Sequence, residues 1–108
     1  YWMMYGIQPF SLQQTKEDYD VGSRVAMIEA VKAGTTTLGD YQKDMEERCV
    51  FLSKIGARGV VTQTIRDAVK RVYEPGELYE FSQEMGRQSL EENLRLYEKW
   101  HGKDGVFG

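Results

Sequence analysis

The order of helix-like and strand-like segments constrains the fold of this chain most. Three helical patterns alternate with three β-rich runs, in the order 15–33, 35–38, 45–55, 58–65, 89–101 and 106–107. Strands that alternate with helices pair in parallel through right-handed crossovers, because each helix carries the chain back to the start of the sheet. We therefore predict an α/β fold with a parallel three-stranded sheet.

Local signals set the ends of these segments. Thr15 and Asp18 resemble a capping box at the start of the first helix, and Ser89-x-x-Glu92 resembles one at the start of the last. Gly34 and Gly56 supply left-handed stops after the first two helices. The sequence thus predicts well-delimited helices on either side of short buried strands.

The segment between the second strand and the last helix carries weaker signals. Residues 67–73 and 77–85 are compatible with two short helices, and Pro75-Gly76 between them predicts a turn. Arg87 falls near the end of this connection. We expect the connection to overhang the carboxyl ends of the strands.

Composition excludes several classes of partner. The formal net charge of -3 gives no broad positive field, so we expect no nucleic-acid partner. No apolar run is long enough to cross a bilayer, and the opening YWMMYGIQPF has no signal-peptide pattern. With a single cysteine as well, the sequence predicts a cytoplasmic protein without membrane contact.

The two ends of the sequence suggest missing flanks. The chain begins without Met and stops on Gly-Val-Phe-Gly, which resembles the start of a strand. The aromatic opening needs an apolar surface to pack on, and three parallel strands leave two open edges. We expect an internal part of a larger domain that self-associates as a homo-oligomer.

Polar side chains follow two of the predicted strands. Asp40 comes directly after the first strand, and Gln63, Thr64 and Asp67 lie at or beyond the end of the next. In β/α barrels the active site is built at the carboxyl ends of the strands. We take these four residues and Arg87 as substrate-pocket candidates, although Asp40 could instead cap a turn and Arg87 could be an ordinary surface residue.

The sequence offers no catalytic residue and no metal site of its own. A hydrolytic metal centre needs about three protein ligands, and this chain has one histidine, His101, at a predicted helix end. Cys49 lies on the apolar stripe of a helix and is expected to be a core residue. A solvated charged face is predicted for the last helix, formed by Glu91, Glu92, Arg95, Glu98 and Lys99.

Three stretches of the sequence are specific enough to indicate a family. The stretch IEAVKAGTTTLGDY resembles the helix, GTTT turn and second barrel strand, ending here in Asp40, of the metal-dependent amidohydrolases of the deaminase and chlorohydrolase branch. Residues 56–61, GARGVV, resemble the third strand, and residues 90–102, LEENLRLYEKWHG, resemble the helix before the fourth strand. The resemblance covers nearly the whole chain. Ser11 and Gln63 stand where adenosine-analogue deaminases carry an acidic residue and an arginine.

This resemblance implies part of a TIM-type (β/α)8 barrel over residues 1–108. It implies a hydrolase or deaminase acting on non-peptide C–N or C–Cl bonds of nitrogen heterocycles or cyclic amidines, its small-molecule substrates. A divalent metal, zinc or iron, would activate water in the full-length parent, and none of the family's metal ligands falls in this segment. The alternative is a noncatalytic α/β interaction module that associates through its open sheet edges.

Overall fold

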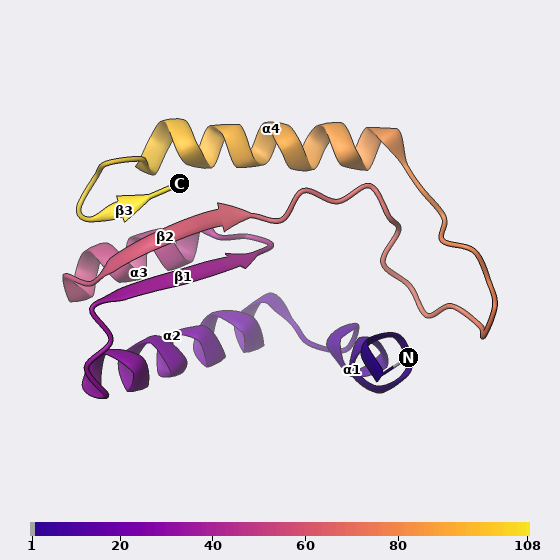
Figure 1. Cartoon of the computed structure of the whole chain (residues 1–108), viewed down its shortest axis with the longest axis horizontal. Coiled ribbons are helices and arrows are strands. Elements are labelled where there is room, and N and C mark those ends of the chain that lie inside the picture. Colours follow the sequence, from indigo (N-terminus) through magenta and orange to yellow (C-terminus); the bar gives the residue numbers. More distant parts are fainter. Residues whose placement is uncertain (1) are drawn as a thin grey trace.

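The computed structural model describes residues 2–108, and for residues 3–5 it describes only the backbone. Within these residues the elements are, in order (Figure 1), η1 (Trp2–Ile7), α1 (Gln8–Ser11), α2 (Lys16–Lys32), β1 (Thr37–Gln42), α3 (Glu46–Ile55), β2 (Arg58–Gln63), α4 (Gln83–Trp100) and β3 (Val106–Phe107). Tyr1 of the aromatic opening lies outside the described residues. Trp2 and Phe10 of that segment are exposed.

The three strands form one parallel sheet in the order β1-β2-β3. β1 pairs with β2 from Thr37 opposite Arg58 to Gln42 opposite Gln63, and Gly59 of β2 pairs with Val106 of β3. This confirms the predicted α/β class and the parallel sheet. Among residues 2–108 no helix is long and apolar enough to cross a membrane.

The helix ends follow the predicted local signals in α2 and α3. Thr15 and Asp18 form a reciprocal capping box, with Thr15 N 2.8 Å from Asp18 Oδ2 and Asp18 N 3.2 Å from Thr15 Oγ1. Gly34 (φ 97°) and Gly56 (φ 68°) follow the two helices in the left-handed conformation that glycine adopts without strain. Both predicted stops are confirmed.

Both α3 and α4 cover the same face of the sheet. Along β2, Gly59 and Val61 are buried whereas Val60 between them is 49% exposed. Val61 lies in one apolar cluster with Leu52 of α3 and Leu96 of α4. Consecutive helices on one face, with the other face open, are what a β/α barrel requires, because its helices form an outer ring.

Three elements differ in their bounds from the sequence-based prediction. The second strand was expected to reach Ile65 but ends at Gln63. The first strand was expected over residues 35–38 but runs over Thr37–Gln42, since pairing with β2 carries it through Gly39. The last helix was expected to begin at Ser89 but begins at Gln83, where Ser82 Oγ accepts a hydrogen bond from Met85 N at 3.3 Å.

The two short helices predicted over residues 67–73 and 77–85 are wrong for most of their length. Residues 64–82 contain no helix, and an isolated antiparallel bridge joins Ala68 to Phe81. The predicted turn at Pro75-Gly76 is confirmed, with Glu77 N donating to Glu74 O at 3.0 Å. The connection is therefore a braced loop.

Replacing Gly59 by alanine is expected to lower the free energy of unfolding by about 1–3 kcal/mol, the usual cost of overpacking a core. A Cβ at Gly59 would lie 2.5 Å from Cδ1 of the fully buried Leu52. Urea-induced unfolding of the full chain measures this cost. Gly39→Ala in β1 is the control, since a Cβ there meets nothing within 4 Å. If Gly59→Ala and Gly39→Ala lose equal stability, the loss comes from the change in backbone freedom, and the predicted clash with Leu52 is contradicted.

Candidate functional site

A pocket of about 540 Å³ lies at the carboxyl ends of β1 and β2. Figure 1 shows α1 and the β2–α4 connection beyond the arrowheads of these two strands. We call this cavity the strand-end pocket. It is lined by Ser11, Leu12, Gln14, Lys16, Tyr19, Gln42, Lys43, Asp44, Arg48, Gln63, Thr64, Arg66, Lys70, Met85, Gln88, Ser89 and Glu92.

Two of the predicted pocket residues, Gln63 and Thr64, do line this cavity. Gln63 is 9% exposed, and its backbone N–H donates to Asn93 Oδ1 at 2.9 Å. Its side-chain Nε2 donates to Glu92 Oε2 at 2.5 Å. Thr64 N–H donates to Gln42 O at 2.9 Å, which joins the two strand ends. The amide of Gln63 is thus held in one orientation by α4.

Asp40 does not reach the strand-end pocket. It was expected just after a strand but lies inside β1, opposite Val61 and on the side of the partly buried Leu38. It lines a second hollow of about 530 Å³ between α2 and β1. Because Leu38 and Asp40 are two residues apart in β1, they share the face of the sheet on which Leu38 packs against the core.

Asp67 and Arg87 also lie outside the lining of the strand-end pocket. Asp67 is exposed in the connection, where its carbonyl accepts a hydrogen bond from Ser82 N at 2.7 Å. Arg87 was expected in the connection but lies in α4, because the helix begins earlier than predicted. It forms ion pairs with Glu84 at 2.7 Å and with Glu91 at 2.5 Å. These contacts describe a surface arginine.

The charged face predicted for α4 is confirmed, because all five of its residues are exposed, and two of them also contact neighbouring elements. Glu92 contacts Gln63, and the Lys99 ammonium pairs with Glu46 of α3. Both contacts join α4 to neighbouring elements, which the spacing of charges along one helix could not indicate.

Sequence reasoning missed the basic residues of the strand-end pocket. Lys16, Lys43, Arg66 and Lys70 line it, and none of them has an ion-pair partner among residues 2–108. They come from the start of α2, the β1–α3 turn and the β2–α4 connection. One sequence signal could have indicated two of them, because Lys43 and Arg66 each lie within three residues of the end of a strand.

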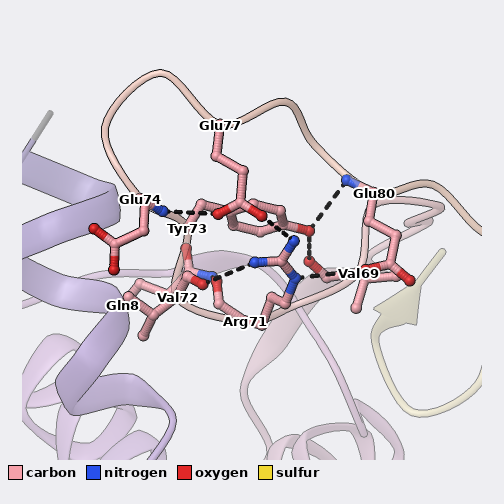
Figure 2. A network of polar contacts seen from close by, with 8 residues as sticks. All are labelled: Gln8, Val69, Arg71, Val72, Tyr73, Glu74, Glu77 and Glu80. Carbon is pink, nitrogen blue, oxygen red and sulfur yellow. Dashed lines mark hydrogen bonds and ion pairs between the residues drawn. The ribbon is translucent and has the colours of Figure 1, made fainter.

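An arginine-centred network braces the β2–α4 connection (Figure 2). The Arg71 guanidinium pairs with Glu77 and with Glu80, and lies 3.9 Å above the ring of Tyr73. The hydrogen bond from Arg71, more than that from Glu74 N–H, lowers the pKa of Glu77. Gln8 Nε2 donates to the Arg71 carbonyl at 2.5 Å, so the network ties the connection to α1 beside the pocket.

The described residues do not fit a metal centre. Across residues 2–108 no three carboxylate, imidazole or thiol side chains gather into a group that could hold a metal ion. His101 lies at the end of α4, as expected, and stacks on Tyr97 with ring centroids 4.4 Å apart. Cys49 is a fully buried core residue, also as expected, and burial raises the pKa of its thiol to about 11. Neither residue has the surroundings of a metal ligand or a nucleophile.

Comparison with known proteins finds relatives over nearly the whole chain. Over 94% of its length the chain is 30% identical to a 5-methylthioadenosine/S-adenosylhomocysteine deaminase of Thermoanaerobacter pseudethanolicus. It is 31% identical, over the same share, to the protein of that name from Caldanaerobacter subterraneus subsp. tengcongensis, and 26% identical to the one from Haloarcula marismortui. The chain spans 21% of the length of each of these relatives. No family model and no solved structure matches. The similarity supports the amidohydrolase resemblance.

Proposed function

We propose that this chain supplies the second and third β/α units of a barrel hydrolase that cleaves non-peptide C–N bonds of nitrogen heterocycles or cyclic amidines. The observation that carries the proposal is the similarity over 94% of the chain to proteins named as deaminases. The helix cover on a single face of the sheet supports the barrel. The strand-end pocket then lies where barrel enzymes build their active sites.

Gln63 is the residue we propose to contact the heterocycle. Because its Nε2 is engaged by Glu92, its Oε1 is left as an acceptor for a ring N–H or amino group of the substrate. A neutral acceptor at the end of this strand favours an amidine-like edge over a negatively charged group. Glu92 acts as a positioning residue, since it fixes the amide.

The metal that the resemblance implies would have to be held outside the described residues, which do not fit it. We propose that zinc or iron is bound by other units of the barrel, where it would supply the activated water. The residues described here bind and orient the substrate.

Ammonia release by the purified natural protein tests the proposed function. We expect release from at least one substrate in a panel that contains adenosine, 5-methylthioadenosine, S-adenosylhomocysteine, guanine and cytosine. We also expect bound zinc or iron and an intact mass well above 12.5 kDa. Gln63→Leu is expected to lower kcat/KM roughly tenfold or more, because a buried polar contact to the substrate is lost. Gln13→Leu, at an exposed position outside the pocket, is the control.

A metal-free protein of 12.5 kDa that releases no ammonia would contradict the proposal and favour the interaction module. Unchanged turnover in Gln63→Leu, with turnover present in the wild type, would remove Gln63 from the site while leaving the hydrolase assignment intact.

A further inference from the structure

We propose that the strand-end pocket binds a phosphoryl group, so that the substrate of this site is a phosphomonoester. The inference rests on the proposed function for the role of the pocket as a substrate site, and it adds the chemical class of the substrate. Three features support it: the positive charge of the lining, the match between that charge and a phosphate, and the contacts that hold the basic segments.

The lining has a surplus of positive charge. Arg48 is neutralised by Asp20, 2.5 Å from its Nη1. The other basic residues are Lys16, Lys43, Arg66 and Lys70, and the acidic ones are Asp44 and Glu92. Four basic against two acidic residues leave two uncompensated positive charges, in a chain whose formal net charge is -3. The pocket is therefore a local reversal of the overall charge, which focuses anions into it.

A phosphomonoester matches this surplus better than a carboxylate does. It carries about -1.5 to -2 charges at pH 7 and presents three acceptor oxygens, whereas a carboxylate carries one charge. Arg66 can pair with two phosphate oxygens at once, and lysines are common phosphate ligands. The Thr64 hydroxyl and the amide of Gln42 add uncharged polar groups to the same lining. A carboxylate would leave one positive charge uncompensated.

Three of the four basic residues, Lys16, Arg66 and Lys70, lie on or next to backbone that is held by contacts within the chain. Lys16 directly follows the Thr15 cap of α2. Both backbone groups of Arg66 bond to Ser89 Oγ, the N–H at 3.0 Å and the carbonyl at 3.2 Å. Lys70 directly precedes Arg71, the centre of the network in Figure 2. Such bracing lowers the ordering cost of binding.

Calorimetric titration of the full-length protein with inorganic phosphate, at constant ionic strength, tests the inference. We expect saturable binding that weakens roughly tenfold or more in Arg66→Gln and in Lys70→Gln, because each loses a charge-assisted contact. Lys32→Gln, at the end of α2 and outside the pocket, should bind as the wild type does. Asp44→Asn should bind phosphate more tightly, because it removes an acidic group from the lining.

Acetate serves as the carboxylate probe and should bind at least roughly tenfold more weakly than phosphate. Equal binding of acetate, no saturable phosphate binding, or equal losses in Lys32→Gln and Arg66→Gln would each overturn the inference. The two proposals fail separately. Phosphate binding without ammonia release from any heterocycle would support the phosphoryl site and contradict the hydrolase assignment. Equal turnover of phosphorylated and unphosphorylated substrates, without phosphate binding, would support the hydrolase assignment and contradict the phosphoryl site.

Discussion

Replacing Asp20 by alanine is expected to lower the free energy of unfolding by about 3 kcal/mol, measured by urea-induced unfolding of the full chain. Arg48 of α3 is 4% exposed, and its guanidinium joins α2 through Asp20 Oδ1 at 2.5 Å and through Tyr19 O at 3.1 Å. Breaking a buried ion pair costs about 3–5 kcal/mol because the remaining charge stays buried without compensation. We place the value at the low end because the Asp20 side chain is 15% exposed.

The double variant Asp20→Ala with Arg48→Met separates the buried charge from the loss of a contact. Removing both partners should restore most of the lost stability, because no uncompensated charge then remains. A surface pair between the same two helices is the control, since Arg24 and Glu47 lie 3.7 Å apart and are both more than 40% exposed. Glu47→Ala should cost less than about 1 kcal/mol. A double variant no more stable than Asp20→Ala would contradict this account.

The parts of the fold that the sequence predicts are those governed by local chemistry. The capping box of Thr15 and Asp18, and the glycine stops at Gly34 and Gly56, are satisfied within a few residues of the chain. The parallel pairing of the strands follows from the alternation of helices and strands. The cap and the glycine stops act without reference to distant residues, which is why they hold in the structure.

The start of α4 was misplaced because the local signals there are weak and compete. Residues 83–89 carry little apolar periodicity, and their helical turns are held by polar pairs, Gln88 and Arg87 with Glu84. The hydrogen bonds from Arg87 and Gln88 lower the pKa of Glu84, in that order of effect. The Ser89-x-x-Glu92 spacing also fits one turn inside a helix, where Ser89 in fact lies. Pattern alone cannot distinguish these two placements.

The candidate site was only half predictable for a similar reason. Gln63 and Thr64 line the pocket because they follow a strand whose end the sequence marks. The position of Asp40 relative to the strand end was predicted wrongly, because pairing with β2 extends β1 beyond Gly39 and strand pairing is a property of two segments. The basic lining gathers residues from three separate segments, so its charge becomes visible only once the chain is folded.

Replacing Leu52 by alanine is expected to lower the free energy of unfolding by about 2–5 kcal/mol, the usual range for a fully buried leucine. Leu52 has no exposed surface and lies in the core cluster with Cys49 and Val61. A cavity at this position would loosen α3 from β2. The same urea titration measures the loss, and Ile55→Ala is the matched control, since Ile55 lies at the end of α3 and is 38% exposed.

The double variant of Leu52→Ala with Gly59→Ala gives the sharpest test of how the helix layer packs. Because the Cβ at Gly59 would lie 2.5 Å from Leu52 Cδ1, removing that methyl group should remove most of the cost of Gly59→Ala. The loss of unfolding free energy in the double variant should therefore be smaller than the sum of the two single losses by roughly 1–2 kcal/mol, within the range measured for residues in contact. Strict additivity would mean that the two side chains do not meet, and it would remove the steric basis for placing α3 on this face of β2.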